Sequence, residues 1–162
     1  MVTPVTLLCG FLGSGKTTLL ARALEQDAFS NAVVIVNEFG EISIDHLIVA
    51  DLTENILELR NGCLCCSIRG DLTMTLRELH RRRQLGEIMK FNHVVVETTG
   101  GADPVPLIHT LMANLPIMQA YSFDTAVCVV DAVNGAKNFA EHATAGNQAA
   151  LADLIVLSKT DI

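Results

Sequence analysis

Gly10-Phe11-Leu12-Gly13-Ser14-Gly15-Lys16-Thr17-Thr18 is the stretch that decides the fold of this chain. It fits the pattern G-x-x-x-x-G-K-S/T, in which glycines let the backbone wrap closely around phosphate oxygens with its amide groups pointing inward. Lys16 supplies a positive charge for the β- and γ-phosphates, and the Thr17 hydroxyl can bind Mg²⁺. Residues 5–9 predict a buried strand before the loop, and residues 17–24 predict a helix after it. The loop amides would therefore lie at a helix N-terminus, which favours the phosphates of a bound nucleotide.

The remainder of the chain alternates short β-branched runs with amphipathic stretches. Strands are predicted at residues 32–36, 56–60, 92–97, 125–131 and 154–157. Helices are predicted at residues 68–85, from Pro104 to Leu115, and within 139–153. This alternation predicts an α/β fold with a mostly parallel sheet and helices on both faces, and the phosphate loop makes it one of the P-loop NTPase type. Ligand-binding loops would gather at the carboxyl ends of its strands.

Composition and charge narrow the class of protein. A chain of 162 residues suits a single domain, 1–162. Its formal net charge of −7 argues against general binding to nucleic acids or membrane surfaces, and no apolar segment is long enough to span a bilayer. The first predicted strand follows Met1 so closely that no signal peptide fits before it. We therefore expect a cytoplasmic protein with reduced thiols, in which Cys9 and Cys128 are core residues of apolar strands.

Two further motifs follow predicted strands. Glu97 closes the run 92–97, where P-loop proteins place an acidic residue that orients Mg²⁺, so Glu97 is the predicted partner of Thr17. Ser158-Lys159-Thr160-Asp161 follows the last predicted strand and resembles the guanine-recognition motif N/S/T-K-x-D. The aspartate of that motif can accept from N1–H and the exocyclic amine of guanine, and the lysine stem can cover one face of the base. The order of the motifs favours GTP over ATP.

Cys63-Leu64-Cys65-Cys66 indicates a metal site. Clustered thiols in a reducing compartment suit Zn²⁺ or another thiophilic ion. Three thiolates leave one position of a tetrahedral ion open, which suits an ion that is held and then passed on. Glu41, Glu38 and a histidine are all candidates for the fourth ligand, and the sequence leaves the choice among them open.

Taken in order, these motifs resemble the CobW family of P-loop GTPases, which is related to the urease and hydrogenase accessory GTPases. Besides the phosphate loop, the resemblance rests on Asn37-Glu38-Phe39-Gly40-Glu41 with Asp45, Asn61-Gly62-Cys63-Leu64-Cys65-Cys66, Glu97-Thr98-Thr99-Gly100 with Ala102-Asp103-Pro104, and Ser158-Lys159-Thr160-Asp161. It spans essentially the whole chain. The cysteine stretch is its most discriminating piece.

The resemblance implies a GTPase that binds a transition metal and delivers it to a client protein or cofactor pathway, with zinc, cobalt and iron as the metals handled in the family. By position it assigns nucleotide binding to Gly13, Ser14, Gly15, Lys16, Thr17, Thr18, Ser158, Lys159 and Asp161. It assigns Mg²⁺ to Thr17, Glu97 and Asp45, and the transported ion to Cys63, Cys65, Cys66 and Glu41. Lys16 and Glu97 would serve catalysis by positioning and charge neutralisation.

Members of the family continue beyond the position of Asp161. We therefore expect residues 1–162 to be a truncated GTPase domain without the C-terminal domain, and such a fragment can be inactive by itself. One alternative is an ATP-dependent small-molecule kinase on a similar fold, although it leaves the three clustered cysteines unexplained. The other is a metal-binding adaptor that does not hydrolyse nucleotide. The sequence leaves the metal, the client and the oligomeric state open.

Overall fold

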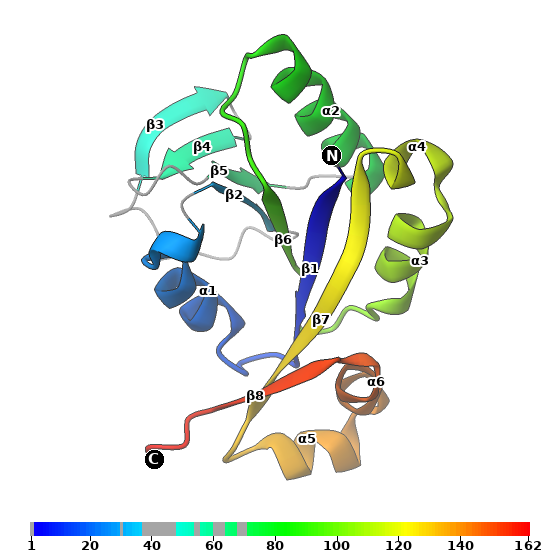
Figure 1. Ribbon diagram of the computed structural model, residues 1–162. Helices are drawn as coiled ribbons and strands as arrows, with labels where there is room; N and C mark the ends of the chain where they lie inside the picture. The colour runs from blue at the N-terminus through cyan, green and yellow to red at the C-terminus, as the bar shows by residue number, and fades with distance from the viewer. Residues whose placement is uncertain (1, 30, 37–47, 54–55, 60–63, 68–70) are drawn as a thin grey trace.

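A sheet of eight strands forms the centre of the part of the chain that the structure describes (Figure 1). The structure is a computed structural model, and it describes residues 2–29, 31–36, 48–53, 56–59, 64–67 and 71–162. The strands are β1 (Thr3–Cys9), β2 (Ala32–Val36), β3 (Ile48–Thr53), β4 (Ile56–Leu59), β5 (Leu64–Ser67), β6 (His93–Glu97), β7 (Tyr121–Asp131) and β8 (Leu154–Ser158). Their order in the sheet is β3-β4-β5-β2-β6-β1-β7-β8.

Most of the sheet is parallel. The pairs β5–β2, β2–β6, β6–β1, β1–β7 and β7–β8 are all parallel, and β3 and β4 extend one edge as antiparallel strands. Parallel strands end at the same edge of a sheet, so the residues that follow β1, β6, β7 and β8 meet at one edge. The predicted mostly parallel α/β fold is confirmed.

Helices connect the parallel strands. They are α1 (Lys16–Leu24), α2 (Leu72–Leu85), α3 (Val105–Ala113), α4 (Leu115–Met118), α5 (Gly135–Glu141) and α6 (Ala143–Leu151), with a short 3₁₀ helix at Asp27–Phe29. Local chemistry explains several of their ends. The Asp71 side chain accepts from the Thr73 amide at 2.8 Å and caps α2, and Gly86 ends that helix in the left-handed region at φ 71°.

The helix predicted from Pro104 to Leu115 is wrong in its extent. The chain is extended at Asn114, with φ −91° and ψ 101°, so α3 ends at Ala113. The side chain of Asn114 then accepts from the Ile117 amide and caps the separate helix α4. An asparagine that can bond its own backbone neighbours competes with helix continuation, and here it divides the helix in two.

Alternate residues of the central strands pack into two separate cores. Leu7, Ile35 and Val96 belong to the core that includes residues of α2, α3 and α4. Leu8, which follows Leu7, and Val95, which precedes Val96, belong to a second core with residues of α1. Because successive strand residues point to opposite faces, the two cores show that helices cover both faces of the sheet, as predicted (Figure 1).

Two strands lie where no strand was predicted. Ile48–Thr53 forms β3, and Leu64–Ser67 forms β5, which lies between β4 and β2. β5 contains part of the cysteine motif, and its residues Cys65 and Cys66 lie opposite Val34 and Ile35 of β2. Leu-Cys-Cys-Ser is too short to show a period, so its strand conformation depends on its neighbours in the sheet.

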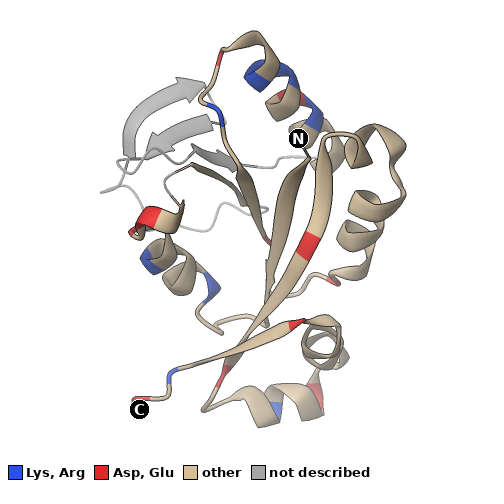
Figure 2. Cartoon of the chain, viewed as in Figure 1, with Lys and Arg blue, Asp and Glu red and all other residues tan. Residues whose placement is uncertain are grey.

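Four arginines lie on α2, namely Arg77, Arg81, Arg82 and Arg83, and other basic residues lie on separate elements (Figure 2). Two of these arginines, Arg81 and Arg82, contact Glu78 of the same helix at 2.9 and 2.7 Å. Glu78 is the single acidic residue of α2, so it balances only part of this positive charge within the helix. None of the helices in the described ranges is both long and apolar enough to cross a membrane.

Candidate nucleotide-binding site

The phosphate loop lies between β1 and α1, and it passes very close to β7. Gly10 has φ 143°, and a Cβ atom on it would lie 2.4 Å from the carbonyl oxygen of Val129. Only glycine fits there, because any side chain would collide with the backbone of β7. Gly15, with φ 93°, stands directly before the first residue of α1. The glycines of the pattern therefore serve both the loop's shape and its packing against the sheet.

Lys16 reaches back across the loop that precedes it. Its Nζ donates to the carbonyl oxygen of Gly10 at 2.8 Å and to that of Phe11 at 3.3 Å. The side chain is well buried even though it comes from the first residue of α1. The ammonium group is thereby held over the loop whose amides would bind phosphate, and its role toward phosphates stays a prediction.

Thr17 and Glu97 form the second part of the site. The Thr17 hydroxyl donates to Oε1 of Glu97 at 2.8 Å, which joins the start of α1 to the end of β6. Glu97 is only 5% exposed, and its other oxygen, Oε2, has no hydrogen-bond partner among the described residues. Burial raises the pKa of Glu97, an effect that the Thr17 hydroxyl and the charge of Lys16 oppose.

This pair has the donor set that Mg²⁺ requires. A hydroxyl and a carboxylate are hard oxygen ligands, and a buried carboxylate oxygen without a partner gains most from a cation. The residues present therefore fit the predicted ion. The third predicted magnesium residue, Asp45, lies outside the described residues.

Ser158 ties the end of β8 to the phosphate loop. Its Oγ donates to the carbonyl oxygen of Ser14 at 2.6 Å and also lies 3.3 Å from that of Val130. The serine at the first position of the N/S/T-K-x-D motif thus donates a hydrogen bond to the backbone of the phosphate loop. The motif stands at the same edge of the sheet as the phosphate loop, with Asp161 exposed beyond it.

Lys159 and Asp131 form an ion pair next to this link. Lys159 Nζ lies 2.7 Å from Oδ2 of Asp131, the last residue of β7. The hydrogen bonds from Asn134 and from Lys159 hold the pKa of Asp131 well below its usual range. We did not predict a role for Asp131. A signal was nevertheless present, since Asp131 ends an apolar strand just as Glu97 does.

Gln148 of α6 is a second contributor that sequence reasoning missed. It is fully buried, and its Nε2 donates to the carbonyl oxygens of Gly100 and Ala102 at 3.2 and 2.8 Å. A Cβ atom on Gly100 would lie 2.5 Å from the amide nitrogen of Leu12. The loop that follows β6 is therefore held by α6 on one side and pressed against the phosphate loop on the other. The sequence gives no local signal for these long-range contacts.

The predicted transported-metal site lies largely outside the described residues. This holds for Cys63 and Glu41 entirely, whereas Cys65 and Cys66 are described only as backbone positions of β5. Cys9 and Cys128 are each 1% exposed and lie opposite one another on β1 and β7. The prediction that these two are core thiols is confirmed.

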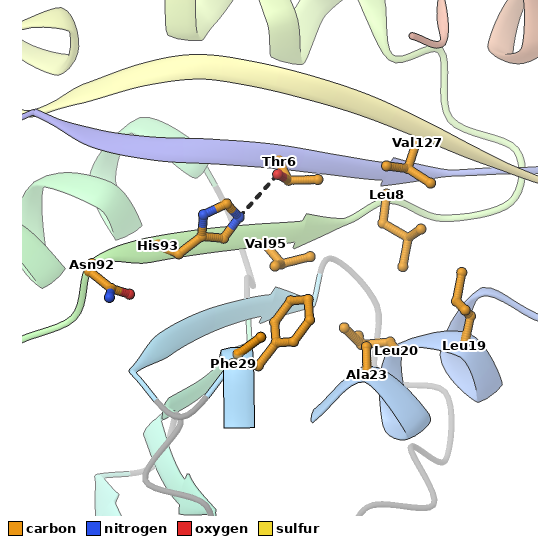
Figure 3. A pocket seen from close by; sticks show the side chains of 11 residues that line it. Thr6, Leu8, Leu19, Leu20, Ala23, Phe29, Asn92, His93, Val95 and Val127 are labelled. Carbon is orange, nitrogen blue, oxygen red and sulfur yellow. Dashed lines mark hydrogen bonds between the residues drawn. The ribbon is translucent and has the colours of Figure 1, made fainter. Parts of the chain in front are cut away.

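An apolar hollow of about 560 Å³ lies between α1 and the sheet (Figure 3). Leu8, Leu20 and Val95 contribute to its lining, and at one end Thr6 Oγ1 and His93 Nε2 share a hydrogen bond of 3.0 Å. Burial lowers the pKa of His93, which favours the neutral ring. No charged side chain among the described residues lines the hollow, so it lacks the groups that hold a triphosphate.

Comparison with known proteins shows the family of this chain. The family model for the CobW/HypB/UreG nucleotide-binding domain matches residues 4–162. The chain belongs to that family. Zinc chaperone YjiA of Escherichia coli K12 is similar to this CobW/HypB/UreG domain, at 41% identity over 158 residues, which are 98% of this chain and 49% of YjiA.

A fungal relative and a solved structure extend the comparison. The zinc-regulated GTPase metalloprotein activator 1 of Schizosaccharomyces pombe is 32% identical over 166 residues, which cover 98% of this CobW/HypB/UreG chain and 39% of the relative. The crystal structure of Zn(II)-bound YjiA GTPase from E. coli superposes with a TM-score of 0.82 at 40% identity, covering 99% of this chain and 50% of that one. The chain thus spans about half the length of YjiA.

Proposed function

We propose that the protein binds and hydrolyses GTP, and that this cycle controls the binding of a transition-metal ion, zinc in the first place, which the protein passes to a client. The observation that carries the proposal is the junction of three elements at one edge of the sheet. Lys16, the Thr17–Glu97 pair and the Ser158 link all meet at the phosphate loop. The similar proteins named a zinc chaperone and a zinc-regulated GTPase metalloprotein activator support the metal.

The residues of the site divide the work of phosphate handling. The backbone amides of residues 13–18 and the Lys16 ammonium would hold the β- and γ-phosphates, with Lys16 exchanging its contacts to Gly10 and Phe11 for phosphate oxygens. Thr17 and Glu97 would hold Mg²⁺, which supplies neutralisation of the charge on the phosphates. Asp45 stays a predicted third member of that site.

Guanine would be read by the motif that follows β8. Asp161 can accept from N1–H and the exocyclic amine, a pair of donors that adenine does not present. The hydrogen bond from Ser158 to the Ser14 carbonyl supports this role, because it would join the proposed base site directly to the phosphate loop.

The cargo ion would be bound by Cys63, Cys65 and Cys66, with Glu41 as the fourth ligand. Thiolates bind cobalt and iron as well as zinc, so these ions remain alternative cargo. Selection among these ions would depend on ligand type, coordination geometry and metal availability rather than on raw affinity alone.

The loop after β6 offers a way for nucleotide to change the rest of the molecule. It begins next to Glu97, packs against Leu12 through Gly100, and is held by Gln148. A γ-phosphate at the phosphate loop would rearrange this segment and, by prediction, the segment 37–45, as γ-phosphate contacts do in switch GTPases. Segment 37–45 includes Glu41, which links nucleotide state to the metal ligands in sequence.

Zinc titration of the protein with GTP, with GDP and without nucleotide tests this coupling. We expect the apparent affinity for zinc to depend on the nucleotide. Equal affinity in the GTP- and GDP-bound forms would sink the coupling. ATP preference with phosphate transfer to a small acceptor would favour the kinase alternative. Metal binding without any nucleotide turnover would favour the adaptor.

Replacing two cysteines tests the metal site itself. The double variant Cys65→Ser and Cys66→Ser removes two of the three predicted thiolate ligands. We expect zinc affinity to fall by at least about 100-fold, while GDP affinity changes by less than about threefold. The matched control is Cys128→Ala, which removes a core thiol. If the double variant still binds zinc as the control does, the ligand assignment is wrong.

A further inference from the structure

Asp131 is a buried carboxylate whose oxygens are both fully engaged. Oδ1 accepts from the amides of Val133 and Asn134 at 2.8 and 3.1 Å. Oδ2 accepts from the Asn134 side-chain amide at 2.9 Å and from Lys159 Nζ at 2.7 Å. The two oxygens thus have different tasks. Oδ1 binds only the turn that follows β7, whereas Oδ2 binds both that turn, through the Asn134 side chain, and a lysine 28 positions away in the chain.

Lys159 is held from the backbone side as well. Its φ of 54° lies in the left-handed region, and it is the only non-glycine residue with positive φ in the described ranges. An unbranched L-residue adopts that conformation at a cost, so the neighbouring contacts must stabilise it. Two are evident on the preceding residue. The Ser158 hydroxyl bonds to Ser14, and the Ser158 carbonyl accepts from the Ala132 amide at 3.0 Å.

These contacts fix both ends of the Lys159 side chain. The backbone end is attached to the phosphate loop through Ser158, and the ammonium end is attached to β7 through Asp131. The methylene stem is consequently stretched between two fixed points and half-exposed. A lysine stem that is held in place presents an apolar strip, which suits the flat face of a base.

We propose that Asp131 is a positioning residue for guanine-nucleotide binding, which holds the Lys159 ammonium so that the lysine stem is already placed for the base. This inference rests on the proposed function, because it takes the segment 158–161 as the base site. Ordering a long side chain in advance removes part of the entropy that binding would otherwise cost. For one lysine the gain corresponds to about a three- to tenfold higher nucleotide affinity.

The rival explanation is that Asp131 only stabilises the turn after β7. Asp131→Asn keeps an acceptor for the Val133 and Asn134 backbone amides, but it loses the charge that holds Lys159 together with the acceptor of the Asn134 side-chain amide. Lys159→Met removes the same ion pair from the other end, leaves the carboxylate and its turn contacts in place, and keeps an apolar stem. Each variant can therefore be checked against the other.

The experiment measures GDP affinity for the wild type, Asp131→Asn, Lys159→Met and the double variant. We expect about a three- to tenfold loss for Asp131→Asn, a loss at least as large for Lys159→Met, and no further loss in the double variant. Asp153→Asn is the control, because Asp153 also accepts from a backbone amide, that of Ala126 at 2.8 Å, and pairs with no lysine of the described ranges. If the two losses multiply in the double variant, or if Lys159→Met binds GDP as the wild type does, the positioning role is overturned.

Inosine diphosphate separates the reading of the base edge by Asp161 from the contact of Lys159 with the base face. It lacks the exocyclic amine that Asp161 would read but offers Lys159 nearly the same ring face. Asp131→Asn should therefore lower the affinities for GDP and for inosine diphosphate by the same factor. Asp161→Ala should instead reduce the preference for GDP over inosine diphosphate. If the wild type binds GDP no better than ADP, both the proposed guanine site and the positioning role of Asp131 are wrong. A guanine-selective wild type with additive Asp131 and Lys159 effects would overturn the positioning role alone.

Discussion

Strands β6 and β7 both end in a buried acidic residue, yet the two carboxylates have opposite surroundings. Glu97 at the end of β6 has one oxygen bonded to the Thr17 hydroxyl and one without a partner among the described residues. Asp131 at the end of β7 accepts from four donors, one of them a lysine ammonium. The pKa of Glu97 is raised, and that of Asp131 is lowered. A carboxylate with spare capacity can take a cation as ligand, whereas a saturated one can only hold protein groups in place.

The largest expected difference between Glu97 and Asp131 variants is in the rate of GTP hydrolysis and its dependence on Mg²⁺. Glu97→Gln should lower the rate of GTP hydrolysis at saturating GTP by about 100-fold, because a neutral amide is a poor ligand for Mg²⁺. Asp131→Asn should act mainly on the GTP concentration needed for half-maximal rate. The measurement is steady-state hydrolysis as a function of GTP and Mg²⁺. If both variants lose the magnesium dependence equally, the contrast between the two carboxylates is wrong.

Ser158→Ala tests whether the base motif and the phosphate loop depend on one another. The change removes the Oγ donor to the Ser14 carbonyl, so we expect about a three- to tenfold loss of GDP affinity and roughly 1 kcal/mol of folding stability. Thr110→Ala is the control, because its hydroxyl also bonds a carbonyl, that of Pro106 at 2.9 Å, but within α3. The link would be unimportant for binding if both variants keep wild-type GDP affinity.

The smallest expected effects are on folding stability, and Glu97→Gln and Asp131→Asn should change it in opposite directions. The raised pKa of Glu97 means that the folded state holds its proton more tightly than the unfolded chain does. Its ionisation therefore destabilises the fold as pH rises above the ordinary value of 4.5. Glu97→Gln should raise the melting temperature of the nucleotide-free protein at neutral pH by about 3 °C, which corresponds to roughly 1 kcal/mol in a domain of this size.

Asp131 should behave in the opposite way. Its lowered pKa stabilises the fold above the ordinary value of 3.8, and this contribution declines as pH falls below that value. Asp131→Asn should therefore lower the melting temperature at neutral pH and show a smaller deficit near about pH 3. Melting curves of both variants and the wild type across this range provide the check. A melting temperature that moves in the same direction for both variants would contradict the assigned environments.

Much of the fold and part of the site follow from local sequence alone. The phosphate loop, the β-branched strands around it and the strand-ending Glu97 are recognisable because glycine spacing, hydrophobic period and helix start act over a few neighbouring residues. The parallel arrangement follows from the alternation of strands and helices, since a helix between two strands forms a right-handed crossover that brings the second strand parallel to the first. The helix break at Asn114 was missed because the residues around it follow a regular helical pattern. The Asn114 side chain caps a new helix there, and this cap competes with continuation of the first helix.

Only the tertiary structure decided what several polar groups contact. Ser158 meets Ser14 across 144 positions, Lys159 meets Asp131 across 28, and Gln148 meets Gly100 across 48. These partners are set by which strands lie side by side, and β5 is likewise a strand through its pairing with β2. The sequence determined that a nucleotide loop and its acidic partner exist, because those signals are local. Which carboxylate was left able to bind a cation, and which was saturated, depended on groups that only the folded sheet brings together.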